Sequence, residues 1–294
     1  MNIVFIGTVD FSRHCLVEIL KNNGKISGII SSENSGFNSD YSDLSDIAEK
    51  VGIPFLLTKD INSADTERWI ADKKPDIIFC FGWSNLIKKR LLNLPPMGIL
   101  GVHPALLPEN RGRHPIIWSI VLGLKKSGLT FFFMDEGADS GPILSQKSFE
   151  ISETDNAADV YEKIKRLACF QIKEFLPHLE KNTYKLTLQD NLKVNYLRKR
   201  STKDGIIDWR MPSNGILNLV RALYKPYPGA EIKIKDKNYK VWKVEKSLKD
   251  LPVNIEPGKV IEVQENIPCV KTGDGSIKIL EIEPEFIFKK GMYL

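Results

Sequence analysis

The sequence predicts an α/β first part, in which helices cover both faces of a mostly parallel sheet, followed by a small all-β part. Two patterns predict this order. Up to residue 134, short apolar runs alternate with stretches of helical spacing, which is typical of parallel sheets. After residue 205, short alternating segments are separated by Pro and Gly, which favours a small β-barrel. The expected architecture is therefore a Rossmann-like domain and an OB-like barrel.

The individual elements follow from local periodicity and end signals. Residues 2–6 form an apolar run that ends at Gly7, and Phe11 to Leu20 has helical spacing closed by Gly24. Further strands are expected at 26–31, 54–57, 77–81, 98–103 and 129–134, and further helices at 42–51, 64–73, 85–92 and 155–179. In the C-terminal part we expect a helix at 212–223 and strands at 231–235, 239–244, 259–263, 269–271 and 277–281.

The domain boundary is expected where the texture of the chain changes. After Lys181 the sequence becomes polar through Gly205, and boundaries fall in such polar stretches. We therefore place the catalytic domain at 1–185, a linker at 186–205 and the OB-like domain at 206–294. The 294 residues are enough for two domains of about 100–200 residues each.

Composition indicates an ordinary soluble, cytoplasmic protein. No apolar run approaches the roughly 20 residues of a membrane span, and residues 1–6 lead into Gly7 without a basic leader. The four cysteines are widely spaced without a CxxC pair, which predicts packing roles rather than a disulfide framework or a metal site.

Charge is uneven along the chain. Residues 181–294 carry 22 Lys and Arg against 14 Asp and Glu, which raises the question of a nucleic-acid partner. Lysines at alternating positions, such as Lys233, Lys235 and Lys237, favour a solvated strand face instead. We therefore expect no nucleic-acid partner.

The turn after the first strand lacks the glycine pattern typical of dinucleotide-binding proteins. Gly7 is followed by Thr8-Val9-Asp10-Phe11-Ser12, and the next glycine is Gly24. The GxGxxG fingerprint is absent, so a nicotinamide or flavin enzyme is not expected.

Of the four histidines, His103 is the best catalytic candidate. It ends an apolar strand, where ligands bind in open α/β sheets, and Arg111-Gly112-Arg113 follows eight residues later. His14 and His178 fall on helices as surface residues, and His114 is expected in a loop beside the site.

An acidic loop at 135–141 follows another apolar strand. Its carboxylates, Asp135, Glu136 and Asp139, do not match an EF-hand register, and no second histidine supports a transition-metal site. No metal is expected. A carboxylate beside His103 stabilises the imidazolium that forms when the ring takes a proton from an amine.

These motifs together resemble the N10-formyltetrahydrofolate-dependent formyltransferases. The carriers are His103-Pro104-Ala105-Leu106-Leu107-Pro108, Arg111-Gly112-Arg113 and the Asp139-Ser140-Gly141 loop, with Phe5-Ile6-Gly7-Thr8, Asp208-Trp209 and Tyr227-Pro228-Gly229 as supporting matches. The resemblance covers about 250 residues. It implies direct formyl transfer from N10-formyltetrahydrofolate to a primary amine, with His103 as base and Asp139 fixing its tautomer.

One position departs from the pattern, because the family usually has Asn where this chain has Gly101. That Asn donates to the developing oxyanion, and losing one such donor costs on the order of 100-fold in rate. Three outcomes are open: a His103 imidazolium together with a backbone N–H or water replaces it, another side chain such as Asn110 does, or the enzyme is slow.

The resemblance also implies where the two substrates bind. The folate pterin is expected against Trp83, Leu86 and Ile87, held by backbone amides while the Leu and Ile side chains pack, with Asp135 and Gly137 on the opposite side. The residues expected at the acceptor are Arg111, Gly112, Arg113 and Pro115.

The acceptor is expected to be a nucleotide-linked amino sugar. Enzymes that formylate methionyl-tRNA usually carry a basic insertion after the second strand, whereas residues 31–43 here contain no Lys or Arg. The expected acceptor is a UDP- or dTDP-linked amino-dideoxyhexose for surface polysaccharide such as lipopolysaccharide O-antigen. The alternatives are methionyl-tRNA formyltransferase and, because of Gly101, an inert nucleotide-sugar or folate binding protein. A homodimer is compatible with the resemblance.

Overall fold

A computed structural model describes residues 1–33, 39–247, 251–252 and 254–294 of the chain. It divides into two compact units. Unit 1 consists of Met1–Pro115, Lys126–Glu150 and Glu162–Leu197, and unit 2 of Ile116–Lys125, Ile151–Tyr161 and Arg198–Leu294. Residues 34–38 of the acidic 31–43 segment lie outside the described residues.

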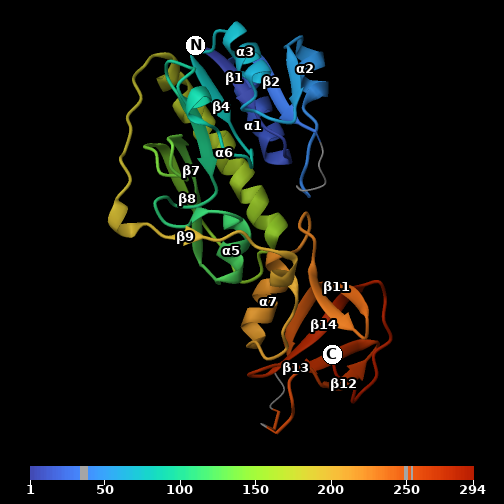
Figure 1. The fold of residues 1–294 in the computed structure, drawn as a ribbon. Coiled ribbons are helices and arrows are strands. Elements are labelled where there is room, and N and C mark those ends of the chain that lie inside the picture. The colour runs from blue at the N-terminus through green and yellow to red at the C-terminus, as the bar shows by residue number, and fades with distance from the viewer. Residues whose placement is uncertain (34–38, 248–250, 253) are drawn as a thin grey trace. The chain divides into compact units, whose positions relative to one another are not determined.

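Unit 1 is built on a seven-stranded sheet in the order β3-β2-β1-β4-β5-β7-β8 (Figure 1). The first five strands of this order run parallel, β7 runs antiparallel to them, and β8 is antiparallel to β7. The strands are β1 Asn2–Ile6, β2 Lys25–Ser32, β3 Phe55–Thr58, β4 Ile77–Cys80, β5 Ile99–His103, β7 Lys126–Phe133 and β8 Ile143–Glu150. The predicted mostly parallel sheet is confirmed.

The helices of the N-terminal part are α1 Asp10–Lys21, α2 Ser45–Val51, α3 Ala64–Asp72, α4 Lys89–Leu92, α5 Pro115–Val121 and α6 Ala157–Glu180. A two-stranded parallel pair joins β6 Arg111–Gly112 to β9 Tyr196–Leu197. Short 3-10 helices occupy Asn191–Lys193 and Thr202–Gly205.

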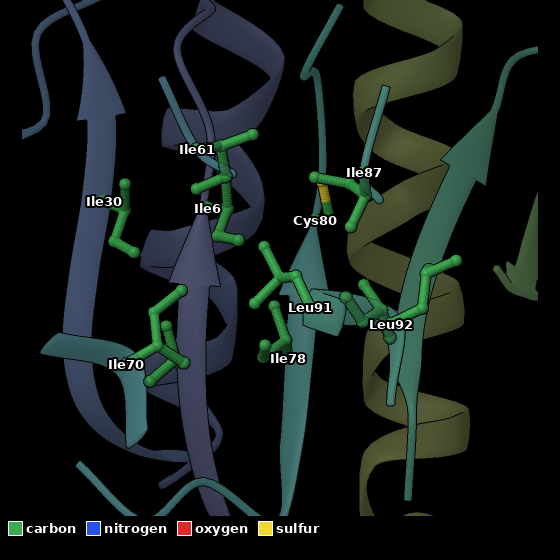
Figure 2. Close-up of a cluster of buried hydrophobic side chains, with 11 residues drawn as sticks. Ile6, Ile30, Ile61, Ile70, Ile78, Cys80, Ile87, Leu91 and Leu92 are labelled. Carbon is green, nitrogen blue, oxygen red and sulfur yellow. The ribbon is translucent and has the colours of Figure 1, made fainter. Parts of the chain in front are cut away.

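Alternation along the central strands sends side chains to opposite faces of the sheet. One face carries an aliphatic cluster in which Val4, Ile6, Ile78 and Cys80 pack against Ile70 of α3 and Leu91 and Leu92 of α4. Figure 2 shows these aliphatic side chains converging from the strands and from the helices that cover them.

The opposite face of the sheet is aromatic and is covered by α6. Phe79 and Phe131 both contact Phe175 of α6, with ring centroids 6.4 and 5.0 Å apart. Helix α1 lies beside α6 on this face, since Lys165 of α6 pairs with Asp10 at 2.9 Å. Helices therefore cover both faces, as predicted.

Unit 2 contains a five-stranded, all-antiparallel sheet in the order β10-β11-β14-β13-β12 (Figure 1). Its strands are β10 Ala230–Ile234, β11 Lys237–Ser247, β12 Val260–Gln264, β13 Ile267–Lys271 and β14 Ser276–Glu283. Helix α7, Ser213–Ala222, packs against β11 and buries Ile216, Leu219 and Val220. The predicted C-terminal β domain is confirmed as this sheet.

One predicted helix is much shorter than expected. Periodicity suggested a helix over 85–92, but α4 begins only at Lys89. Lys88 is extended, with φ −83° and ψ 160°. The backbone before α4 is held by Asn62, which donates to Leu86 O at 2.9 Å and accepts from Lys88 N at 2.7 Å. A long-range side-chain contact overrides the local helical pattern.

Candidate active site

His103 is the last residue of β5, at the carboxyl end of the parallel strands. Its side chain is buried. The chain after it is held against β7 and β8, because Thr130 donates to Ala105 O at 2.6 Å and Gln146 donates to Leu107 O at 2.8 Å. The sheet therefore positions both the histidine and the loop that follows it.

Both ring nitrogens of His103 face acceptor atoms of the protein. Nε2 lies 2.7 Å from the carbonyl oxygen of Asn110, and Nδ1 lies 3.6 Å from Oδ2 of Asp139. A carbonyl oxygen only accepts, so the first contact assigns a ring hydrogen to Nε2. Asn110 thus contributes to the tautomer of His103, and Nδ1 is the nitrogen directed at the carboxylate.

Asp139 is held on a tightly ordered loop. Its backbone has φ 55°, a left-handed conformation that is uncommon outside glycine. Its Oδ2 accepts the Gly112 N–H at 2.9 Å, which links the acidic loop to the Arg111-Gly112-Arg113 segment. The sequence predicts that His103 and Asp139 lie together. In the structure, His103 Nδ1 lies 3.6 Å from Asp139 Oδ2.

Asp135 and Gly137, expected at the folate, shape the same loop. Oδ1 of Asp135 accepts from Gly137 N at 3.0 Å and from Ser140 Oγ at 2.6 Å. Both residues are exposed. The Asp135 carboxylate therefore forms a turn within the loop, and a role at the folate stays a prediction.

Gly101 lies in the middle of β5, where neighbouring side chains fill the space an Asn would need. A Cβ built on Gly101 would lie 2.8 Å from Cγ of Met134 and 3.3 Å from Cζ of Phe132. The Asn110 side chain, the other candidate donor, accepts from Asn195 Nδ2 through its Oδ1 at 3.1 Å, and a role of its Nδ2 at the oxyanion stays a prediction.

The segment expected to hold the folate has one buried and one exposed side chain. Ile87 packs as expected and is 3% exposed, whereas Leu86 is 71% exposed, so the expected packing of Leu86 is wrong. Leu86 precedes the short α4 and points away from the core. The indole Nε1 of Trp83 is buried without a hydrogen-bond partner among the described residues.

An ion pair connects the two segments expected on either side of the folate. Lys89 of α4 lies 2.7 Å from Oε1 of Glu136. This carboxylate raises the pKa of Lys89 above its ordinary value through their hydrogen bond. Both side chains are exposed, so water screens the pair and it adds little to stability.

The acceptor segment is held by contacts that sequence reasoning did not predict. Arg113 donates from Nη1 to Ser84 O at 2.7 Å, so its guanidinium lies against the expected folate segment. Gly112 has φ 104°, and a Cβ there would lie 2.4 Å from Leu197 O. Pro115 begins α5, a position that suits proline.

Arg111 is buried and held by contacts within the protein. Its Nε and Nη2 donate to Oε1 of Gln189 at 3.1 and 2.7 Å, and Nη1 donates to the Tyr196 hydroxyl at 3.2 Å. These bonds use three of the five guanidinium N–H groups and fix the orientation of the side chain. Gln189, Asn195 and Tyr196 were read only as linker residues, since nothing local in their sequence marks a site.

The remaining histidines and the cysteines lie away from this arrangement or serve packing. His14 and His178 are exposed on α1 and α6, as expected. All four cysteines are free, and Cys15, Cys80 and Cys269 are buried. No group of three or more metal-ligating side chains occurs in the described part of the chain, and no helix within that part is long and apolar enough to cross a bilayer.

Comparison with known families decides the class. Residues 1–173 match the formyl transferase family, and residues 199–287 match the formyl transferase C-terminal domain. This chain is a formyltransferase. Its formyl donor is N10-formyltetrahydrofolate, and the enzyme moves a one-carbon group to an acceptor.

The formyltransferase is similar over nearly its whole length to proteins with different acceptors. It is 31% identical to methionyl-tRNA formyltransferase of Kosmotoga olearia, over 96% of this chain and 92% of the relative. Its fold is similar to that of an N-formyltransferase of Helicobacter canadensis, solved with folinic acid and dTDP-3-aminofucose, at TM-score 0.72 and 22% identity over 94% and 98% of the two chains.

Two further solved structures share the fold of the formyltransferase. The sugar 3N-formyltransferase WlaRD, solved with dTDP and 5-N-formyl-tetrahydrofolate, aligns at TM-score 0.71 and 21% identity over 97% of this chain and 99% of its own. The chain also aligns with HypX of Aquifex aeolicus at TM-score 0.70 and 19% identity, but spans 44% of that longer protein.

The folate donor suits the residues of this formyltransferase. Two features lie in the segment expected to bind the pterin. One is the Trp83 indole N–H, which is buried without a partner among the described residues, and the other is the backbone before α4, which Asn62 binds at Leu86 O and Lys88 N. A buried donor without a partner is costly unless a ligand satisfies it. Trp83, Leu86 and Ile87 stay the residues predicted to hold the donor.

Proposed function

We propose that this formyltransferase acts on the primary amine of a UDP- or dTDP-linked amino sugar, an amino-dideoxyhexose for surface polysaccharide. The observation that carries the proposed chemistry is the buried His103–Asp139 pair, with its Nε2 hydrogen engaged by Asn110. The choice of acceptor rests on two observations. Residues 31–43 contain no Lys or Arg, and sugar N-formyltransferases share the fold over nearly their whole length.

In the proposed reaction, the formyl carbon of the bound donor is supplied to the acceptor amine. A new C–N bond forms to the sugar, the bond to N10 breaks, and tetrahydrofolate leaves with a proton on N10. His103 takes the proton that the amine loses, through Nδ1, the ring nitrogen beside Asp139. The imidazolium then gives a proton to N10 as the bond from N10 to the formyl carbon breaks, which returns the ring to its neutral form. The carboxylate stabilises the imidazolium as it forms.

Gly101 offers no side-chain donor to the oxygen that gains charge. The protonated His103 ring, together with a backbone N–H or a water, is the replacement that the proposal assigns. The alternative donor is the Nδ2 group of Asn110, whose Oδ1 accepts from Asn195. The backbone carbonyl of Asn110 keeps the ring oriented.

The arginines of the basic C-terminal part make contacts within the protein. Arginine is the side chain best suited to bidentate phosphate contacts, and each of the four arginines after residue 181 is engaged inside unit 2. Arg198 pairs with Asp204, Arg200 lies 4.8 Å from the Trp118 ring, Arg210 pairs with Asp208, and Arg221 donates to Ser152 O and Asp155 O. This supports the sugar acceptor over tRNA.

Formyl transfer to a panel of UDP- and dTDP-linked amino sugars tests the proposal, with methionyl-tRNA as a parallel acceptor. Release of tetrahydrofolate is followed by absorbance. We expect turnover with one sugar, and loss of that turnover in His103→Ala while the variant stays folded. Unchanged turnover in His103→Ala would exclude His103 as the base.

Methionyl-tRNA formyltransferase is the second candidate, because the relative at 31% identity carries that name. Transfer to methionyl-tRNA with silence across all sugars would replace the proposal by this one. Binding of the donor without any turnover would favour an inert binding protein. Cytoplasmic location and a homodimer belong to the same proposal, and sedimentation of the purified enzyme tests the dimer.

A further inference from the structure

A third segment, residues 185–197, follows α6 and contacts both the Arg111–Gly112 strand after His103 and the region of the Asp139 loop. Thr187 pairs with Ile143 at the start of β8, and Tyr196 and Leu197 pair with Arg111 and Gly112. Residues 174–198 lie between the two regions matched by the formyl transferase families. The 185–197 segment is therefore described by neither match.

Gln189 is the central contact of the 185–197 segment. Its Nε2 donates to Asp139 O at 2.8 Å and to Gly141 O at 2.7 Å. Its Oε1 accepts two hydrogen bonds from Arg111 at 3.1 and 2.7 Å. Both amide hydrogens and both lone pairs of the oxygen are used, so every bond that this side chain can make goes to the two loops.

The contacts of Gln189 close a ring around the reacting pair. Arg111 binds Gln189, Gln189 binds the backbone of Asp139, and the Asp139 carboxylate binds the N–H of Gly112, the next residue after Arg111. The left-handed backbone of Asp139 persists only when its surroundings hold it. Gln189 supplies two of these holding bonds on the carbonyl side.

A second amide of the segment acts on the histidine side. Asn195 accepts from Asn110 N at 2.6 Å and donates to Asn110 Oδ1 at 3.1 Å. Asn110 has φ 61°, and its carbonyl is the atom that His103 Nε2 contacts. Asn195 thus fixes the Asn110 backbone, whose carbonyl faces Nε2 of His103, and Gln189 fixes the backbone of Asp139, whose carboxylate faces Nδ1.

We infer that Gln189 is a positioning residue for formyl transfer, which sets the Asp139 carboxylate against His103. This inference rests on the proposed role of the His103–Asp139 pair. Gln189 touches neither reacting atom in the proposed chemistry. It acts through the backbone of Asp139, so its loss should lower kcat more than it changes the KM of either substrate.

Two substitutions separate this role from a merely structural one. Gln189→Glu keeps the oxygen that accepts from Arg111 but replaces the amide donor by an oxygen facing the carbonyls of Asp139 and Gly141. Gln189→Ala removes both sets of bonds and leaves the buried Arg111 guanidinium without its amide partner, which costs stability. The matched control is Asn191→Ala, an exposed residue of the same segment.

Steady-state kinetics with the accepted substrate, together with thermal melting, test the inference. Misplacement of a catalytic group by about 1 Å can cost on the order of 100-fold. We expect Gln189→Glu to lower kcat by on the order of 10- to 100-fold with both KM values near wild type. Asn191→Ala should match wild type, and Gln189→Ala should lose both kcat and melting temperature.

Wild-type kcat in folded Gln189→Glu would overturn the inference. A loss of activity that only follows the loss of folded protein in both variants would also overturn it, since Gln189 would then be structural. His103→Ala keeps the two hypotheses apart. An active His103→Ala enzyme contradicts the proposed function, whereas inactive His103→Ala with active Gln189→Glu contradicts this inference alone.

Discussion

Gly101 lies on β5, the strand that carries His103, and Met134, the residue after β7, packs against it. A Cβ added at residue 101 would lie only 2.8 Å from Cγ of Met134. Gly101 is also buried. The side chain of Met134 therefore takes up the space beside Gly101, and Asn at position 101 without a change at position 134 would clash with it.

We expect Gly101→Asn to lower the free energy of unfolding by about 1–3 kcal/mol, the usual cost of overpacking a core. Urea denaturation measures it. Gly52→Asn is the control, because Gly52 ends α2 with φ 67° and nothing lies within 4 Å of its added Cβ. The double variant with Met134→Ala should recover part of the loss. A Gly101→Asn protein as stable as the control would contradict the packing argument.

At the scale of elements, local pattern predicted most strands and helices of the chain. The strands β1 and β4 are continuous buried runs, and α6 keeps its apolar periodicity over 24 residues. Strand β8 was not predicted, because its residues are mostly half-buried and polar. Helix α5 was missed as well, since it is only seven residues long.

The candidate site was predictable only where its residues carry a local signal. His103 and Asp139 end or follow apolar strands and belong to recognisable motifs. Gln189 contacts Asp139, which is 50 positions away in the sequence, and Asn195 contacts Asn110, which is 85 positions away. Their neighbourhood in the sequence is polar and irregular, so no periodicity or motif distinguishes them from linker residues.

The short α4 makes Asn62 a testable support of the folate segment. Its amide donates to Leu86 O and accepts from Lys88 N, on either side of Ile87. Asn62→Asp keeps the acceptor for Lys88 N, removes the donor to Leu86 O and adds a negative charge. Because one hydrogen bond is worth about 1 kcal/mol and about 1.4 kcal/mol is tenfold in affinity, we expect the KM for the formyl donor to rise about fivefold at similar kcat.

The control for Asn62→Asp is Asn93→Asp, an exposed amide that follows α4. The two variants introduce the same charge near the same helix. An equal rise of KM in both would mean that charge, rather than the lost donor, weakens the donor complex. A change confined to the acceptor KM would show that the Asn62 contact does not shape the folate side.

At the scale of the whole molecule, buried thiols link folding to alkaline pH. Burial raises the pKa of the Cys80 thiol to about 12 and that of Cys15 well above its ordinary value. An unfolded thiol ionises near about 8.5. As pH rises past that value, the unfolded chain loses these protons first, so stability present at neutral pH is lost between about pH 8.5 and the folded values.

We therefore expect the free energy of unfolding to be flat near neutral pH and to fall above about pH 8.5. Each buried thiol adds a slope of up to about 1.4 kcal/mol per pH unit. Urea denaturation from pH 7 to 10.5 measures the curve, and Cys80→Ala should flatten it, whatever its cost at pH 7. The half-buried Cys169 offers the control, since Cys169→Ala should flatten the curve less. A slope unchanged by Cys80→Ala would mean that groups other than this thiol carry the alkaline loss.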